Sequence, residues 1–391
     1  MENRLVRLPI LATLTACAVL VLAGPLRAQV VYYPPGGGGP FSVAGPPPGA
    51  MTGLMGDPHA PASYPGHDQA IAPSHRSIED RSWDPACDPA NKQCITFAAE
   101  TLLLSRSPAN DQILVREGAL DPGGDPILTT DNLQFDQEIV PRFTLVMHQS
   151  NGWDLMFSIL ECDDWQASQL VARETDISIS APNILLSNVN AARFTYESQL
   201  WSMEAGVLWR ICPRITMTLG PRFLALDEGM FVEDNFLSFD TLVPSYAINV
   251  TNRLIGFQVG FHGTLAYLSE QVSIDGVFKL GYYHNEAHHQ IEDLSGTTNI
   301  GPIAADDGAT TTVGEFRINA TFRFNDNVKA WVGYNVLWLL GVATPPNQIP
   351  GNDAYDLPFA VARLGPPGAL SIDTSDNLIY GGVAGGFDVS Y

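Results

Sequence analysis

Ten segments of alternating apolar and polar residues follow one another from Ile95 to the end of the chain, and this alternation constrains the fold more than any other feature. They span roughly 95–105, 139–149, 152–162, 193–209, 214–227, 246–263, 271–284, 312–324, 328–339 and 378–391. A period of two residues is typical of β-strands with two different faces. The segments also have the length of about ten residues that a tilted strand needs to cross a bilayer.

The connections between these segments are alternately long and short. The long ones follow the odd-numbered segments and span 106–138, 163–192, 228–245, 285–311 and 340–377, whereas the short ones are stretches such as SNG, ICP and NDN. Bacterial outer-membrane barrels have long extracellular loops and short periplasmic turns, and an even strand number returns both chain ends to the periplasm. The pattern predicts an all-β fold, a transmembrane antiparallel β-barrel of about 10 strands within a range of 8–12.

A soluble β-sandwich would show a similar alternation, so the chemistry of the two faces decides between the folds. In the segment 312–324 the apolar face has Phe316, Ile318, Ala320 and Phe322, and the polar face has Glu315, Arg317, Asn319, Thr321 and Arg323. Aromatic residues near the segment ends fit the headgroup level of a membrane. They are Trp153, Trp201, Trp209, Tyr282, Trp338 and Tyr391. If the apolar rows face lipid, the sheet must close on itself, because backbone groups in hydrocarbon have to be paired.

The polar rows of a closed barrel face its lumen, which gives a set of candidate functional residues. The lumen-facing candidates are Arg142, Arg222, Lys279, Glu315, Arg317 and Arg323, with Glu100, Asp154 and Lys329 on the same faces. A barrel of about eight strands is just filled by its side chains. Charges of both signs in a narrow lumen therefore have two interpretations, a structural plug of paired charges or a selectivity lining, in which Arg222, Arg317 and Arg323 would form the constriction.

The N-terminus predicts export. Arg4 and Arg7 precede an apolar run over 10–24, and cleavage after Ala28 would give a signal peptide over 1–28. Lipidation at Cys17 is the alternative, although apolar residues continue beyond that cysteine. Residues 29–94 are rich in Pro and Gly and predict a periplasmic tether, which leaves 95–391 for the barrel. No later stretch has eighteen consecutive apolar residues, so helical membrane spans are not expected there.

The formal net charge of −22 argues against a nucleic-acid partner, because phosphates are bound by clustered Lys and Arg. Cys87 and Cys94 are close enough in sequence to form a disulfide in an oxidising compartment. Zinc is the alternative for this pair, but two further ligands at suitable spacing are missing. We expect no metal at these cysteines.

A cluster of potential metal ligands, His284, Glu286, His288 and His289, follows the seventh segment. Alternate residues of a strand share a face, so they could converge on a metal, but an ordinary solvated loop is the simpler interpretation. Asp306 and Asp307 fall in the same predicted loop, which leaves open a loop-based hydrolase. The loop acids Asp163, Asp164, Glu233, Asp234, Asp306, Asp307, Asp353 and Asp356 could also bind Ca²⁺ or Mg²⁺ next to anionic lipid. We predict a non-enzymatic protein with no catalytic residues, no cofactor and no metal.

The chain ends in Phe387-x-Val389-x-Tyr391, with an aromatic residue as the last one. Outer-membrane barrels share this type of ending, so the expected partners are outer-membrane lipid and, through this strand, the barrel-assembly machinery. The stretches GPRFLALDE (220–228), TNRLIGFQVG (251–260), FKLGYYHN (278–285) and VGYNVLWLLGVATPPNQ (332–348) resemble the beta-barrel porin seven family of bacterial outer-membrane proteins. The resemblance covers about 95–391 and implies a location in the cell outer membrane and a pore role.

Three functions follow as hypotheses. The first is a narrow porin-like channel for small solutes. The second is a structural or adhesive surface barrel whose lumen is plugged by side chains. The third is the loop-based hydrolase, which would depend on residues such as His288 and Asp307. The sequence does not identify a solute.

Overall fold

The computed structural model describes residues 94–118, 124–149, 152–181, 184–235, 241–294, 303–349 and 372–391. The predicted signal peptide and residues 29–93 of the predicted tether lie outside these residues, as do Cys87, Asp353 and Asp356, whereas Cys94, the last residue of that tether, is the first of β1. No helix among them is long and apolar enough to cross a membrane.

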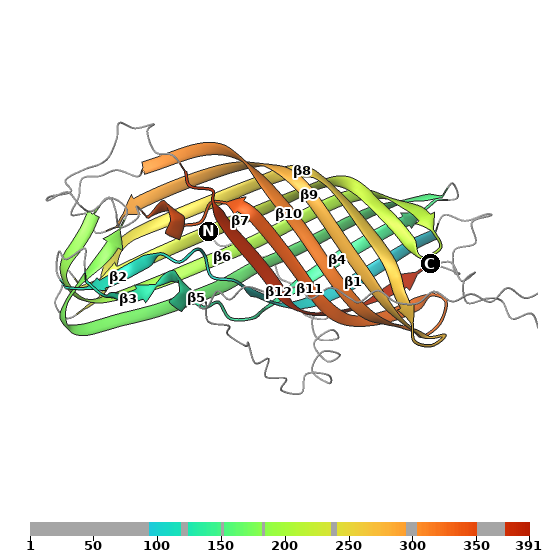
Figure 1. Cartoon of the computed structure of the whole chain (residues 1–391), viewed down its shortest axis with the longest axis horizontal. Helices are drawn as coiled ribbons and strands as arrows, with labels where there is room; N and C mark the ends of the chain where they lie inside the picture. Colours follow the sequence, from blue (N-terminus) through green and yellow to red (C-terminus); the bar gives the residue numbers. More distant parts are fainter. Residues whose placement is uncertain are drawn as a thin grey trace, which may run out of the picture. The chain divides into compact units, whose positions relative to one another are not determined.

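Twelve strands form a single sheet in which every pairing is antiparallel (Figure 1). They are β1 (Cys94–Arg106), β2 (Ile113–Glu117), β3 (Pro126–Thr129), β4 (Glu138–His148), β5 (Trp153–Ala181), β6 (Ile184–Cys212), β7 (Ile215–Asp234), β8 (Val243–Tyr267), β9 (Val272–Asp293), β10 (Ile303–Arg323), β11 (Val328–Val342) and β12 (Asp376–Ser390). Two short 3₁₀ turns, η2 (Thr130–Asn132) and η3 (Pro346–Gln348), lie in the connections.

Ten of these strands close a ring. The order runs β5-β4-β1-β12-β11-β10-β9-β8-β7-β6, and β6 pairs with β5 again. The hairpin of β2 and β3 lies outside this ring and joins it at β5, through Val115–Glu117. Each of the ten predicted segments overlaps one ring strand, which confirms the antiparallel barrel. Closure leaves the ring without an edge in the part where all ten strands pair, as a bilayer requires.

The strands extend far beyond the predicted segments at the end opposite the short turns. β5 and β6 each have 29 residues and form one continuous hairpin. The expectation that 163–192, 228–245 and 285–311 are loops is therefore wrong for most of their residues, because β5 to β10 continue through them. The physical reason is that a strand projecting into water no longer needs an apolar outer face, so the lipid-facing pattern ends while the strand does not.

The outer face of the ring is apolar in a band next to the short turns. Exposed side chains of this band include Phe143, Phe157, Met203, Leu219, Ile255, Phe257, Phe261, Phe278, Phe316, Ile318, Phe322 and Phe387. Soluble proteins rarely expose apolar patches of this extent, whereas lipid solvates them. The described residues therefore form a transmembrane β-barrel.

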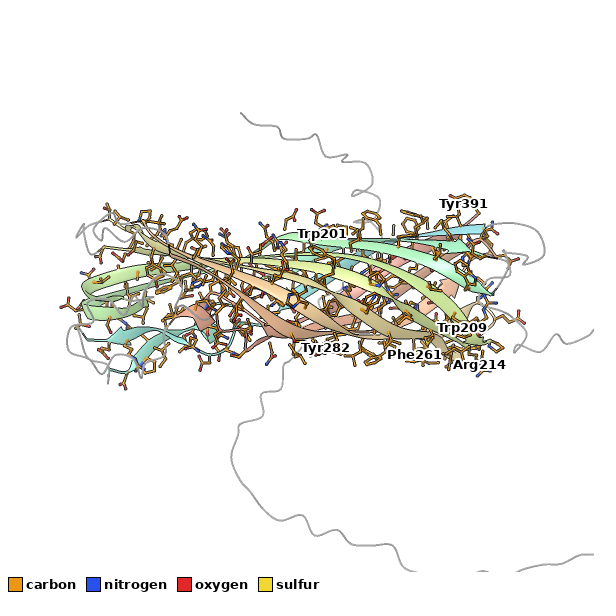
Figure 2. The ribbon with its side chains drawn as sticks, turned by 90° about the horizontal axis from the view of Figure 1, so that it is seen from above. Trp201, Trp209, Arg214, Phe261, Tyr282 and Tyr391 are labelled. Carbon is orange, nitrogen blue, oxygen red and sulfur yellow. The ribbon has the colours of Figure 1, made fainter. Side chains whose placement is uncertain are left out.

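Aromatic rings mark two levels of this band (Figure 2). Trp209 and Tyr391 lie near the end with the short turns, and Trp201 and Tyr282 lie nearer the middle of the strands. Trp209, Tyr282 and Tyr391 are 60%, 69% and 81% exposed. Trp201 and Tyr282 were expected near strand ends, but they lie inside β6 and β9. They stand where the apolar face ends, so they mark the headgroup level and not the end of a strand.

Cys94 is disulfide-bonded, whereas Cys162 and Cys212 are not part of a disulfide. Because Cys87 lies outside the described residues, its pairing with Cys94 stays a prediction.

Candidate functional site

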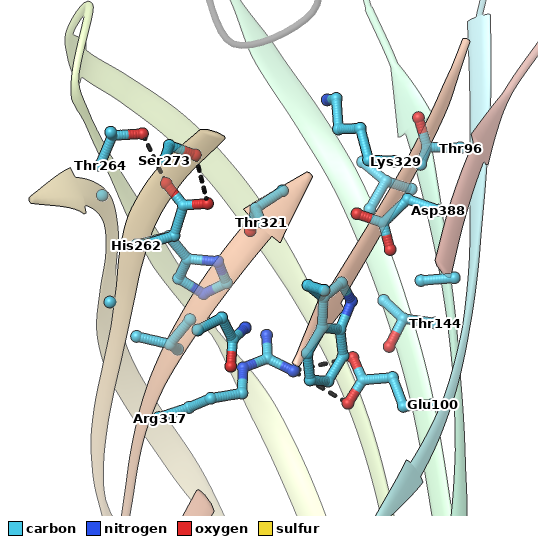
Figure 3. Close-up of a pocket in the computed structure, with 18 of the residues that line it drawn as sticks. Thr96, Glu100, Thr144, His262, Thr264, Ser273, Arg317, Thr321, Lys329 and Asp388 are labelled. Atoms are coloured by element: carbon cyan, nitrogen blue, oxygen red, sulfur yellow. Dashed lines mark hydrogen bonds and ion pairs between the residues drawn. The ribbon is translucent and has the colours of Figure 1, made fainter. Parts of the chain in front are cut away.

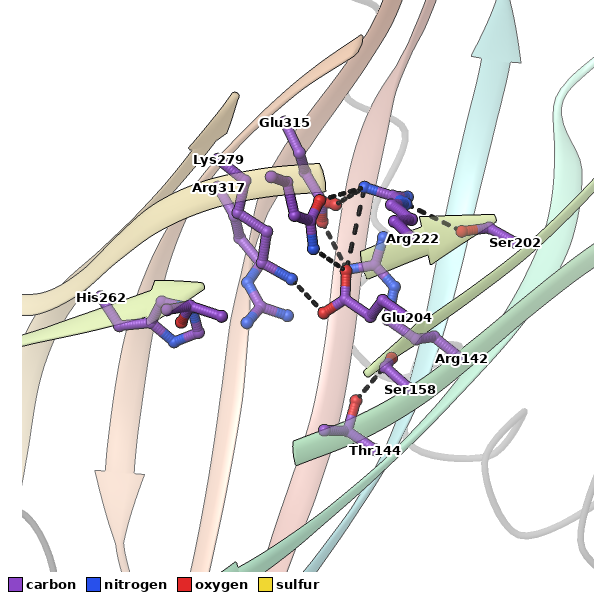
Figure 4. A network of polar contacts seen from close by, with 12 residues as sticks. Arg142, Thr144, Ser158, Ser202, Glu204, Arg222, His262, Lys279, Glu315 and Arg317 are labelled. Atoms are coloured by element: carbon purple, nitrogen blue, oxygen red, sulfur yellow. Dashed lines mark hydrogen bonds and ion pairs between the residues drawn. The ribbon is translucent and has the colours of Figure 1, made fainter. Parts of the chain in front are cut away.

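The polar rows of the ring strands converge on a charged network inside the lumen (Figure 4). Its members come from six strands: Glu100 on β1, Arg142 on β4, Glu204 on β6, Arg222 on β7, Lys279 on β9, and Glu315 and Arg317 on β10. Each occupies the face opposite the lipid-facing residues of its strand, so the period of two alone directs it inward. Except for Arg317, these residues are less than 10% exposed.

Glu315 is the centre of the network. One carboxylate oxygen accepts a hydrogen bond from Nη1 of Arg142 at 2.7 Å, and the other accepts one from Nη1 of Arg222 at 3.2 Å. The Nε of Arg222 also donates to the hydroxyl of Ser202 at 2.9 Å. Glu315 thus connects β4 and β7 across the lumen through two charge-assisted hydrogen bonds.

Glu204 and Glu100 extend the network on either side. Glu204 accepts hydrogen bonds from Nζ of Lys279 and, at 2.8 Å, from the amide of Gln258. Glu100 accepts two from Nη1 of Arg317, at 2.8 and 2.9 Å, and its carboxylate lies 3.6 Å from Arg142. Four cations thus meet three carboxylates. Buried charges of both signs with mutual hydrogen bonds can fill a lumen, whereas a single unpaired buried charge would be costly.

An apolar layer fills the lumen on the far side of this network. Its side chains also point into the lumen, but they lie further from the short turns than the charged network does. All of them are at most 3% exposed. They include Leu102, Leu104, Leu160, Leu200, Leu224, Leu226, Leu254, Leu337, Leu339, Leu378 and Tyr380. Because these side chains belong to one core cluster, they close the ring with hydrocarbon above the charges.

A second buried ion pair lies above this layer. Arg106 of β1 bonds to Glu228 of β7, and Glu228 also accepts from the hydroxyls of Tyr196 at 2.7 Å and Ser198 at 3.0 Å. The guanidinium stacks 4.4 Å from the ring centroid of Phe135, which ties the 130–137 connection to the barrel. Burial raises the pKa of the Glu228 carboxyl, although Arg106 and these hydrogen bonds act in the opposite direction.

This ion pair lies outside the lipid-facing band. Asp227, the residue next to Glu228, points outward and pairs with Arg253 of β8 at 2.8 Å, where both side chains are about 40% exposed. A charged pair on the outer face belongs in water or among headgroups, so this level is beyond the hydrocarbon. Arg106 and Glu228 did not appear among the candidates because each is the first residue of an expected loop, 106–138 and 228–245.

Below the network, towards the short turns, the lumen holds a cavity of about 170 Å³ (Figure 3). Its walls are mostly hydroxyl-bearing and charged. The hydroxyl residues are Thr96, Thr144, Ser158, Ser202, Thr264, Tyr267, Ser269, Ser273 and Thr321, and the charged residues nearest the short turns are Glu270, Asp275, Arg323, Lys329 and Asp388. The cavity lies at the end of the barrel that has the short turns, and it is called the vestibule below.

The structure separates the six lumen-facing candidates into two groups. Arg142, Arg222, Lys279, Glu315 and Arg317 belong to the network, whereas Arg323 lies apart, on the vestibule wall. Asp154 lies at the rim, where its carboxylate accepts from the backbone of Gln149. Glu204 and Gln258 are members that the candidate set omitted. Glu204 and Gln258 lie at alternate positions from Ser202 and His262, on the lumen-facing side of their strands. The period of two could therefore have identified Glu204 from the sequence.

The predicted ligand cluster at 284–289 is split between the two faces of β9. His288 is on the outer wall, 46% exposed, and bonds to Asp306 at 2.6 Å across the strand pair. His289 points inward and is 3% exposed, and neither ring nitrogen has a hydrogen-bond partner. Burial, and to a lesser extent His288, lower the pKa of His289 to about 4. In the part of the chain that the structure describes, no three potential ligands are close enough to hold a metal.

The loop acids are dispersed in the same way. Glu233 forms an outward-facing pair with Arg193 at 2.9 Å. The Asp307 carboxylate accepts from the backbone of Gly308. Of the two residues named for the hydrolase hypothesis, His288 contacts Asp306 and not Asp307.

No protein-family model and no curated protein sequence matches this chain. Among solved structures, the outer membrane protease OmpT from Escherichia coli covers 78% of this chain and 100% of its own, with 13% identity and a TM-score of 0.42. The toluene transporter TbuX of Ralstonia pickettii covers 76% and 88%, with 7% identity and a TM-score of 0.29. Ail, the attachment invasion locus protein of Yersinia pestis, covers 76% and 99%, with 9% identity and a TM-score of 0.20. Similarities of this size transfer no function to this chain, and the resemblance to the porin seven family stays a prediction.

Proposed function

We propose that this protein is a non-enzymatic surface barrel whose lumen is closed by its own side chains and whose role is structural or adhesive. The observation that carries this proposal is the stack of two closed layers in the lumen. The charged network fills one level and the leucine-rich layer fills the next. A hydrated ion would have to displace both, and each is made of side chains that are almost entirely buried.

The height of the barrel supports a role at the surface. At about 3.3 Å per residue, the 29 residues of β5 extend for roughly 95 Å, which at a tilt of about 45° gives a height of about 70 Å. The apolar band of such a barrel needs only about 25 Å. More than half of this strand therefore projects beyond the membrane, together with β6, and presents a polar outer wall that a partner could bind.

A narrow channel is the second candidate, because polar and charged side chains line the vestibule. Planar-bilayer recordings of the folded barrel separate the two functions. A closed lumen predicts no conductance steps at voltages where a reconstituted general porin conducts. Unitary steps that grow with salt concentration would overturn the closed-lumen proposal in favour of the channel.

Surface display has its own test. In a shortened variant, Leu170–Arg193 is replaced by an Asn-Gly turn that joins Gln169 to Phe194, a pair already in register. Cells that produce this variant should lose adhesion to surfaces or to one another, while the amount of folded barrel in the outer membrane is unchanged. Adhesion equal to that of the full-length protein would contradict a role for this hairpin.

We also propose that assembly uses the β12 strand. Tyr391 exchanges two backbone hydrogen bonds with Ile95 of β1, at 2.9 and 3.2 Å, so the last residue closes the ring at the periplasmic end. A terminal strand that completes the ring is accessible until closure, which fits recognition by the assembly machinery.

A further inference from the structure

The strand β10 extends beyond its neighbour β11 at the end opposite the short turns. β10 pairs with β9 from Ile303 to Phe322 without a register shift, but it pairs with β11 only from Thr312 onward. Among the described residues, no strand lies on the other side of Ile303–Thr311, and Figure 1 shows this part of β10 at the margin of the sheet. The projecting part of the barrel therefore has an open strand edge.

The chain that could have covered this edge is directed into the lumen instead. β11 leaves β10 at Gly341, where φ is +88° and the register with β12 shifts. Just after this turn, Ala343 donates its N–H to the side-chain oxygen of Asn252 at 2.9 Å, and its carbonyl accepts from the side-chain amide of Asn252 at 2.8 Å. Ala343 and Asn252 are both 0% exposed. Because β8 anchors the end of β11 in this way, the open edge of β10 is a fixed feature of the fold.

Alternate residues of the edge direct their backbone groups away from β9. Arg323 donates its N–H towards the β9 side, and the ladder is regular, so the odd-numbered residues of β10 bond to β9 and the even-numbered ones point to the open side. Ala304, Asp306 and Gly308 are such even-numbered residues, and all three are exposed. The N–H of Gly308 is bonded to the carboxylate of Asp307 at 2.8 Å. Unpaired backbone groups of this kind are a template for an added strand.

Acidic side chains determine which strand fits this edge. Asp306 and Asp307 point to opposite faces of β10 and are both exposed. His288 bonds to Asp306, but the Asp306 side chain is still 84% exposed. On the neighbouring β9, Glu286 is exposed, and Arg253, the cation opposite it in the ladder, is already bonded to another carboxylate. Like charges in opposite positions destabilise a strand pair and unlike charges stabilise it, so a second copy of this edge is disfavoured and a basic strand is favoured.

We propose that β10 binds an extended, basic segment of a partner polypeptide as an added strand along Ala304–Thr310. The inference rests on the proposed adhesive function and names the kind of partner that it would use. Main-chain hydrogen bonds provide the affinity of such an added strand, and side chains provide the selectivity. A carbonyl of the partner would replace the Asp307 carboxylate at the N–H of Gly308, which leaves that carboxylate for a Lys or Arg of the partner.

The test is the binding of a fluorescently labelled peptide to the folded, full-length barrel in uncharged detergent, followed by fluorescence anisotropy. The first peptide has about nine residues and contains only threonine and lysine. The second has glutamate in place of lysine, and the third is the lysine peptide with every backbone nitrogen methylated. Saturable binding of the first peptide is expected, with affinities at least about tenfold lower for the other two, since they lose the charge match or several hydrogen bonds.

Variants of the barrel test the edge itself. Ala304→Pro removes an N–H on the open side without breaking the β9 ladder, so it should weaken binding about fivefold, whereas Ala304→Val keeps the N–H and should bind as the wild type does. Asp306→Asn should weaken binding up to about fivefold. Its control is Glu174→Gln, which removes an exposed acid of β5 and should leave the affinity unchanged.

Three results would overturn the proposal: no saturable binding of the lysine peptide, equal binding of the methylated peptide, or equal affinities of Ala304→Pro and the wild type. Each of these results is obtained with purified barrel. They are therefore independent of the adhesion of cells that carry the shortened β5–β6 hairpin, which tests the proposed function.

Discussion

Replacing Glu315 by Gln should destabilise the barrel more than any exposed charge change. Glu315 is 1% exposed, and its two oxygens neutralise Arg142 and Arg222 at 2.7 and 3.2 Å. Glutamine keeps the size but removes the charge, so the network would change from four cations against three carboxylates to four against two. Breaking a buried ion pair by removing one partner costs about 3–5 kcal/mol.

The measurement is urea unfolding in detergent micelles or lipid vesicles, followed by the fluorescence of the seven tryptophans. Glu315→Gln should lower the free energy of unfolding by about 3 kcal/mol or more. The matched control is Glu233→Gln, which removes the same charge from an exposed pair with Arg193. That pair is 44% and 35% exposed, so its loss should cost less than about 1 kcal/mol.

A double variant distinguishes charge balance from a loss of packing. Arg142→Gln removes the main partner of Glu315, and Arg142→Gln with Glu315→Gln restores the original charge excess of one. The double variant should therefore be more stable than the sum of the two single changes predicts. If Glu315→Gln stays within about 1 kcal/mol of the wild type, or if the changes are additive, the network is not the tightly coupled plug described above.

Four other predictions concern different parts of the barrel. Burial lowers the pKa of His289 to about 4, so the neutral imidazole stabilises the fold fully above the ordinary histidine pKa of 6.5. This stabilisation is lost as the pH falls towards 4, at up to about 1.4 kcal/mol per pH unit. His289→Phe should remove this pH dependence from unfolding curves recorded at several pH values, and an unchanged dependence would refute the prediction. Leu224→Ala should cost about 3–5 kcal/mol in the same unfolding assay, because it leaves a cavity in the apolar layer, whereas a cost below about 1 kcal/mol would mean that this layer is loosely packed. Tyr391→Ala should slow insertion into the outer membrane of cells but not refolding in detergent, and normal insertion in a pulse-chase experiment would contradict the proposed role of β12. In a variant with serine at Cys162 and Cys212, a water-soluble maleimide should label Arg253→Cys but not Phe257→Cys in intact membranes, and equal labelling of both would misplace the membrane surface.

The sequence predicted the part of the barrel that faces lipid, because lipid requires an alternation of apolar and polar residues along each strand there. Between Ile255 and Phe261, the outward residues of β8 are apolar and exposed, and the inward Gln258 is buried. An apolar outer face and a polar inner face are what a barrel in lipid requires. The alternation therefore predicted both the position of the strand and whether each side chain faces lipid or lumen. The inward placement of Arg142, Arg222 and Lys279 follows from the same period of two.

Most of the barrel beyond the apolar band was not predicted, because the polarity of its two faces is reversed there. Along β8, Ile248, Val250 and Leu254 face inward and are buried, whereas Arg253 faces outward. The apolar set thus changes from one parity to the other between Leu254 and Ile255. The predicted segment 246–263 crosses this change in β8, but in β5, β6, β9 and β10 the residues on the far side of the lipid-facing pattern were assigned to loops. The contacts between Arg106 and Glu228, which join distant segments, have no sequence signal of this kind.

The reversal also has a consequence for how the lumen is closed. In lipid the outer face must be apolar, so the inner face carries the polar groups and is held by ion pairs. In water the requirement is inverted, and the projecting part of the ring can bury an apolar core as a soluble β-protein does. The charged network can exchange partners or admit water, whereas the leucine-rich layer has few polar groups with which to bind an ion, among them the hydroxyl of Tyr380. Closure therefore depends on the apolar layer, and loss of the charged network alone would enlarge the vestibule without opening the barrel.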